Sequence, residues 1–81
     1  MDRKEIFDKV VAICKDVFDN EEVILTEASD AAEVEEWDSL THLNIISDME
    51  EEFKISFTLE EITDAKNLGE LVDALMRHLE E

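Results

Sequence analysis

The amino-acid sequence predicts an all-α fold with three main helices and one short helix. Apolar residues recur at intervals of three and four in several segments, as they do on the buried face of an amphipathic helix. No segment of useful length alternates polar residues with β-branched ones, which is the pattern of a half-buried strand. The chain has no proline and a single glycine, so few residues would interrupt a helix. We expect one domain over residues 1–81, because a chain of 81 residues can form one modest core.

The first helix is predicted from about residue 3 to residue 18. Asp2 and Glu5 have the spacing of a capping box, which pairs the backbone N–H groups that the start of a helix leaves free. The predicted inward face is apolar throughout and consists of Ile6, Phe7, Val10, Val11, Ile13, Cys14, Val17 and Phe18. Since Cys14 lies within this face, we expect a buried structural thiol rather than a reactive one.

Residues 19–37 show no sustained periodicity and are predicted to form a long connection. A connection of this length is unusual in a compact domain and often belongs to function. We expect Val23, Leu25 and Val34 to hold it against the helices, with a short helical turn near residues 29–33.

The second helix is predicted from about residue 39 to residue 53, with Asp38 as its N-cap. An aspartate at this position accepts hydrogen bonds from N–H groups of the first turn. Ser39 would then lie at the mouth of the helix, where unpaired N–H groups and the helix dipole favour an attached anion. A phosphate ester on Ser39 fits this position. The predicted apolar stripe of this helix is Leu40, Leu43, Ile46, Met49 and Phe53, widened by Ile45.

Two further helices complete the predicted fold. Thr58 and Glu61 form a capping box that starts a short third helix ending near residue 64. The last helix is predicted after Asn67, and its inward stripe is Leu68, Leu71, Val72, Leu75 and Leu79. Gly69 in its first turn lowers the helix propensity, and the sequence alone offers no reason for it.

The chain is strongly acidic, with 24 Asp and Glu against 7 Lys and Arg and a formal net charge of −17. Such a field repels nucleic acid and anionic membranes and steers basic proteins toward the surface. No apolar run reaches the length of a membrane span, and the N-terminal residues lack the core of a signal peptide. The single cysteine excludes an intramolecular disulfide and fits a reducing compartment. We expect a cytoplasmic monomer.

The acidic residues are concentrated around Ser39, since no Lys or Arg occurs between Asp16 and Phe53. A run of charge is most often a solvated surface. The absence of basic residues over so long a span favours the alternative, a docking surface for basic partner proteins.

The motif Asp38-Ser39-Leu40, followed by the helical segment from Thr41 to Phe53, resembles the core of an acyl carrier protein. The resemblance extends over nearly the whole chain and includes the apolar first helix, the long connection and the two last helices. An Asp-Ser-Leu tripeptide occurs often by chance, but its position at the start of an acidic helix makes it specific here. The resemblance implies an acyl-carrier-type four-helix bundle.

The resemblance also implies a function. Ser39 would receive 4′-phosphopantetheine from coenzyme A through a separate phosphopantetheinyl transferase. The prosthetic thiol would carry an acyl thioester to acyl-transferring or condensing enzymes with basic docking surfaces, while the chain itself catalyses nothing. The expected partner contacts are Leu40, Thr41, Asn44, Asp48 and Glu51. The residues expected near a cleft that shelters the acyl chain are Leu43, Ile46, Ile62, Leu68 and Val72.

The sequence departs from many fatty-acid carriers just before the motif. They have Leu-Gly-x-Asp-Ser-Leu, whereas this chain has Glu35-Glu36-Trp37-Asp38-Ser39-Leu40. The missing glycine reduces the backbone freedom of the loop. We expect the Trp37 ring to pin the loop to the bundle, the alternative being that it covers one side of the prosthetic arm. A specialised pathway is therefore open beside fatty-acid synthesis.

Other functions compete with an acyl carrier. Aminoacyl carriers, either D-alanyl or peptidyl, share the bundle and the serine, and an acidic bundle without a prosthetic group would bind partners directly. Ser39, His42 and Asp38 invite comparison with a hydrolytic triad, but triad partners usually come from separate elements. We expect His42 at the surface beside the attachment site. No metal site is predicted, because His42, His78 and Cys14 lack ligand spacing.

Overall fold

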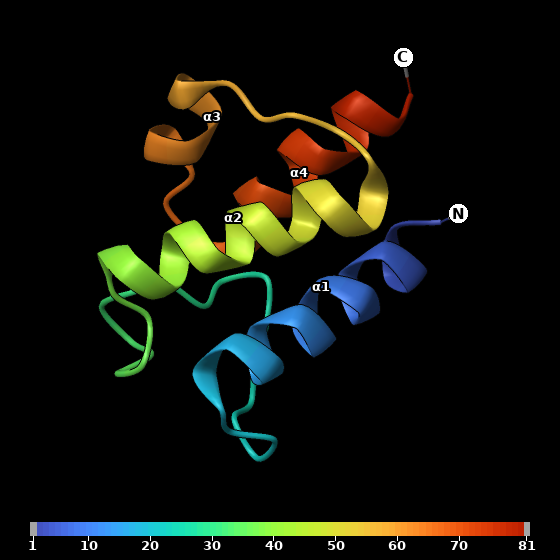
Figure 1. Ribbon diagram of the computed structural model, residues 1–81. Coiled ribbons are helices and arrows are strands. Elements are labelled where there is room, and N and C mark those ends of the chain that lie inside the picture. Colours follow the sequence, from blue (N-terminus) through green and yellow to red (C-terminus); the bar gives the residue numbers. More distant parts are fainter. Residues whose placement is uncertain (1, 81) are drawn as a thin grey trace.

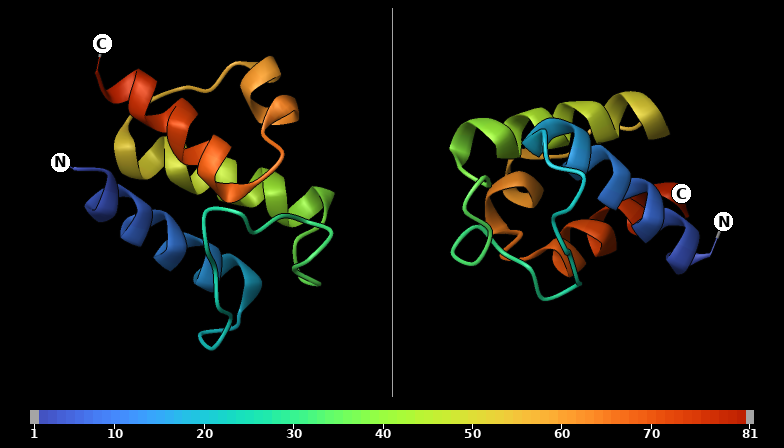
Figure 2. Two further views of the ribbon diagram at one scale, coloured as in Figure 1. Left: turned by 180° about the vertical axis from the view of Figure 1, so that it is seen from behind. Right: turned by 90° about the horizontal axis from the view of Figure 1, so that it is seen from below.

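The structure is a computed structural model that describes residues 2–80, and this part of the chain forms four α-helices. They are α1 (Arg3–Phe18), α2 (Ser39–Phe53), α3 (Leu59–Asp64) and α4 (Leu68–Leu79) (Figure 1). The all-α prediction is confirmed, and the helices begin and end where the sequence predicts. Figures 1 and 2 show that both termini lie at one end of the bundle, whereas α2 begins at the opposite end.

The core lies between α1, α2 and α4. The side chains that are almost fully buried are Ile6, Val10, Cys14, Ile45, Met49, Leu68, Leu71, Val72 and Leu75. Burial raises the pKa of the Cys14 thiol to about 12. The thiol therefore stays protonated at neutral pH, and the prediction of a buried structural cysteine is confirmed.

Side-chain caps determine where α1, α3 and α4 begin. Asp2 and Asn67 each accept a hydrogen bond from the backbone N–H three residues later, at 2.9 and 2.8 Å. The hydroxyl of Thr58 accepts from the N–H of Glu61 at 3.1 Å, and the Glu61 carboxylate accepts from the N–H of Thr58 at 2.8 Å. These bonds satisfy donors that a helix start leaves free, so the helix boundaries were readable from the sequence.

The buried face of α2 differs from the predicted stripe. Leu40 and Leu43 belong to that stripe but are 70% and 55% exposed, so the stripe is not the buried face of the helix. An α-helix turns once per 3.6 residues, which aligns residues 42, 45, 46 and 49 on one face. The polar His42 therefore turns inward in place of the two leucines, and the buried residues of α2 are Ile45, Ile46 and Met49.

The long connection is fastened to the start of α4 by backbone hydrogen bonds. The N–H of Leu68 donates to the carbonyl oxygen of Ser29, and the N–H of Gly69 donates to that of Glu27, both at 2.8 Å. The guanidinium of Arg3 pairs with the Glu27 carboxylate at 2.6 Å and joins this segment to α1. A Cβ atom on residue 69 would lie 2.9 Å from the Glu27 carbonyl oxygen. Close approach of the loop backbone thus explains the glycine.

Within the connection, Val34 is buried, and Val23 and Leu25 pack against the core, as predicted. The short helical turn expected near residues 29–33 is a single hydrogen-bonded turn, in which the N–H of Val34 donates to the carbonyl of Asp30 at 2.9 Å. Among residues 2–80, no helix combines the length and the apolar character needed to cross a bilayer.

Substitution of Gly69 tests the role of this close approach. Crowding of the Glu27 carbonyl costs about 1–3 kcal/mol, against a gain of about 1 kcal/mol that alanine brings to a helix. We expect Gly69→Ala to lower the free energy of unfolding by up to about 2 kcal/mol in chemical denaturation. Ser47→Ala, at an exposed position in α2, should stay within about 0.5 kcal/mol of the wild type. A Gly69→Ala protein more stable than the wild type, which the helix propensity of alanine alone would produce, would contradict this explanation.

Candidate functional site

Asp38 and Thr41 form a reciprocal cap at the start of α2. One oxygen of the Asp38 carboxylate accepts hydrogen bonds from the N–H groups of Leu40 and Thr41, both at 2.9 Å. In return, the Thr41 hydroxyl oxygen accepts from the N–H of Asp38 at 2.8 Å, and it donates to the carbonyl oxygen of Glu36 at 2.9 Å. The cap therefore specifies both the first residue of α2 and the path of the chain that enters it.

The cap keeps Asp38 ionised. The N–H of Thr41, together with that of Leu40, lowers the pKa of the Asp38 carboxyl below its usual value, because these bonds stabilise the charged form. The same two N–H groups are then unavailable to another anion at Ser39. The sequence-based expectation that free N–H groups would meet such an anion is therefore only partly met, because the cap takes two of the N–H groups at the helix start.

Ser39 is the first residue of α2, and it is exposed. It lies at the end of the bundle opposite the termini, where α2 begins in Figure 1. An exposed hydroxyl at a capped helix start is accessible to another enzyme and is held in one place by the backbone around it.

Ser39 borders an open groove of about 620 Å³ between the start of α2 and α3. The residues that line this groove are Ala31, Trp37, Asp38, Ser39, His42, Leu43, Ile62, Thr63, Ala65 and Lys66. Leu43 and Ile62, two of the residues expected near an acyl cleft, thus lie beside Ser39. The other three, Ile46, Leu68 and Val72, are buried in the core and do not line the groove.

Trp37 is pinned to the bundle, as predicted, and also forms part of the groove. It is 6% exposed, and its ring lies against Phe18 of α1 with a centroid distance of 6.1 Å. Its indole Nε1–H donates to Nδ1 of His42 at 3.1 Å. The ring also lines the groove that Ser39 borders, and the alternative that it covers one side of the prosthetic arm stays a prediction.

His42 lines the groove beside Ser39, as expected, but its ring is engaged with neighbouring residues rather than free at the surface. His42 is half-buried, and its Nε2 lies 2.9 Å from the carbonyl oxygen of Ile62. With Trp37 at Nδ1, both ring nitrogens are occupied, and the Asp38 carboxylate is occupied by the cap. Ser39, His42 and Asp38 therefore do not assemble a hydrolytic triad. Within residues 2–80, no group of three or more His, Cys, Asp or Glu side chains could hold a metal ion.

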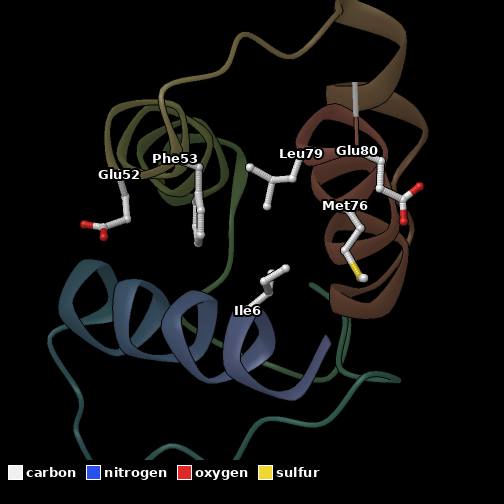
Figure 3. A pocket seen from close by; sticks show the side chains of 6 residues that line it. All are labelled: Ile6, Glu52, Phe53, Met76, Leu79 and Glu80. Carbon is white, nitrogen blue, oxygen red and sulfur yellow. The ribbon is translucent and has the colours of Figure 1, made fainter. Parts of the chain in front are cut away.

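A second hollow of about 370 Å³ lies at the other end of the bundle, near the termini. In Figure 3 the side chains of Ile6, Phe53, Met76 and Leu79 face a common space, while the carboxylates of Glu52 and Glu80 point away from it. Leu79 is 39% exposed there, at the last position of the predicted inward stripe. None of the described residues that line this hollow carries a hydroxyl, thiol or amine, so the groove at Ser39 is the candidate site.

The residues of α2 that are expected to contact partners differ in their exposure to solvent. Leu40, Asn44 and Glu51 are exposed, while Asp48 and Thr41 are half-buried. The hydroxyl of Thr41 is committed to the cap, which leaves its methyl group for any contact. Sequence reasoning missed this role of Thr41, although the Asp-x-x-Thr spacing is a cap signal. It also missed Ala31, Thr63, Ala65 and Lys66 in the groove, which no local pattern marks.

Comparison with known proteins identifies the family. A family model described as the phosphopantetheine attachment site matches residues 8–75. The solution NMR structure of a holo acyl carrier protein from Geobacter metallireducens is 36% identical, with a TM-score of 0.84 over 91% of this chain and 85% of that one. The chain belongs to the acyl carrier protein family. No match was found among curated proteins.

The prosthetic group of this carrier is 4′-phosphopantetheine. The residues at the start of α2 fit such a group, because an exposed hydroxyl adjoins a groove with apolar walls. Among the described residues that line the groove, Lys66 is the one lysine or arginine and Asp38 is the one carboxylate. The carrier domain also implies contacts with modifying and biosynthetic enzymes.

The role of the Asp38 charge can be tested through pH. Since the folded-state pKa of Asp38 is lowered, its stabilisation is complete above the usual value of 3.8 and is lost as the pH falls through the folded value. Asp38→Ala should therefore lower the melting temperature at neutral pH, and the difference from the wild type should shrink below that value. Glu51→Ala removes an exposed carboxylate from the same helix and serves as the control. If the melting temperatures of Asp38→Ala and the wild type differed equally at neutral pH and below pH 3.8, the stabilising role of the Asp38 charge in the cap would be contradicted.

Proposed function

We propose that this carrier holds acyl groups as thioesters on 4′-phosphopantetheine attached to Ser39 and presents them to biosynthetic enzymes. The observation that carries the proposal is the position of Ser39, which is exposed at the capped start of α2 and borders the groove. Attachment requires that a separate phosphopantetheinyl transferase bring coenzyme A to the serine. The Ser39 oxygen then forms a new bond to the pantetheine-side phosphorus as the phosphoanhydride of coenzyme A breaks. Adenosine 3′,5′-bisphosphate is the leaving group, and the serine proton is released.

The groove favours an acyl cargo over an aminoacyl cargo. Its walls include the side chains of Trp37, Leu43 and Ile62, which stabilise an apolar chain by removing it from water. The ammonium group of an aminoacyl cargo would lose hydration against these three side chains. Asp38 is the carboxylate that lines the groove, and it is engaged in the helix cap. Fatty-acid synthesis and a specialised acyl-transfer pathway are both consistent with an acyl cargo. Glu36 in the place of the usual glycine, with Trp37 beside it, favours the specialised one.

The acidic surface around Ser39 is proposed to dock enzymes with basic surfaces, namely the transferase and acyl-transferring or condensing enzymes. Leu40 adds an apolar contact beside the attachment residue, since it is 70% exposed. Asn44, Asp48, Glu51 and the methyl group of Thr41 continue the surface along α2. We propose that the carrier acts as a monomer in the cytoplasm, where a reduced prosthetic thiol is maintained.

Transfer of the prosthetic group tests the proposal directly. The purified unmodified protein is incubated with coenzyme A and a broad-specificity phosphopantetheinyl transferase, and its intact mass is measured. The wild type and Ser47→Ala should each gain one phosphopantetheine group, because Ser47 is exposed on the same helix but away from its start. Ser39→Ala should gain none. An unmodified wild type, in a reaction where a control carrier is modified, would refute the function.

A further inference from the structure

The imidazole ring of His42 joins the loop before α2 to α3. Its Nδ1 accepts a hydrogen bond from the indole N–H of Trp37 at 3.1 Å, and its Nε2 lies 2.9 Å from the carbonyl oxygen of Ile62. An indole N–H only donates, and a carbonyl oxygen only accepts. Both neighbours therefore require the same neutral tautomer, with the proton on Nε2. The ring also stacks on that of Trp37 with an interplanar angle of 28°.

The helix that His42 contacts has few other attachments. α3 is six residues long and contains no buried residue. The carbonyl of Ile62 is one of the last four of α3, which lack partners within the helix, and His42 provides that partner. From the opposite side, Nε2 of His78 in α4 lies 2.8 Å from a carboxylate oxygen of Glu61. Loss of one of these contacts would loosen α3 without removing a side chain from the core.

We propose that His42 is a positioning residue that holds the two walls of the groove together. Trp37 belongs to one wall and Ile62 to the other, and Ser39 lies at the rim. By bonding to both walls, His42 holds them at a fixed spacing on either side of an acyl group and limits the access of water to the thioester. This inference rests on the proposed function of Ser39 and assigns a role that neither the serine nor the cap performs.

Three substitutions separate the two bonds of His42. His42→Gln places an amide N–H close to the position of Nε2 and retains the bond to Ile62. His42→Asn places an amide oxygen close to the position of Nδ1 and retains the bond to Trp37. His42→Phe keeps an aromatic ring and loses both bonds. His78→Gln is the matched control, because it alters the opposite attachment of α3.

Thioester hydrolysis measures the effect on cargo. Each variant is loaded from octanoyl-coenzyme A by a phosphopantetheinyl transferase, and loss of the octanoyl group at neutral pH is followed by intact mass. Hydrolysis should be about two- to tenfold faster in all three variants, the factor that one lost hydrogen bond produces, because each of them loses at least one of the two bonds. Unchanged rates in all three variants would overturn the proposal. A wild-type rate in His42→Gln or in His42→Asn would also overturn it, because the bridge requires both bonds.

Hydrogen exchange of the Trp37 indole N–H provides a second measurement, made on the unmodified protein. Exchange should be about two- to tenfold faster in His42→Phe and His42→Gln, and near the wild-type rate in His42→Asn and His78→Gln. Unchanged exchange in His42→Phe would refute the bond itself. A wild type that accepts no phosphopantetheine refutes the function of Ser39 instead, so the two failures are distinguishable.

Discussion

The reciprocal cap between Asp38 and Thr41 is the interaction on which the site depends. Because each residue binds the backbone N–H of the other, the cap specifies Ser39 as the first residue of α2. A helix that began one turn later would leave this serine in a flexible loop, and one that began earlier would turn it along the helix face. The cap also occupies two of the N–H groups that an anion would otherwise bind. The start of α2 is therefore adapted to hold a serine in place more than to bind a free phosphate.

A second set of contacts brings the long connection to the correct place around this cap. Gly69 lets the loop backbone approach α4, and the hydrogen bond from its N–H to Glu27 anchors the middle of the connection. Trp37 anchors the end of the connection against Phe18, immediately before the cap. The connection is long and has no helix, yet it is fixed at both points. These anchors explain how an irregular segment forms one side of a defined groove.

Local signals in the sequence predicted the helices and their caps, because periodicity and capping involve residues that are close in the chain. The same reasoning placed Ser39 at a helix start. It did not identify the buried face of α2, because the helix face was chosen by apolar character, whereas packing turned His42 inward and left Leu40 and Leu43 exposed. The reason for Gly69 lies in a contact with Glu27 across the fold, and the groove is completed by residues of α3. Such contacts depend on tertiary structure, which no local pattern encodes.

The central claim is that the capped serine carries the prosthetic group, and locating that group on the chain tests it most directly. The holo protein can be fragmented in a tandem mass spectrometer, and the fragments that retain the phosphopantetheine mass identify the modified residue. The group should map to Ser39 alone, in every molecule that carries it. A group mapped to another hydroxyl, such as that of Ser29, Ser47 or Ser56, would contradict the account.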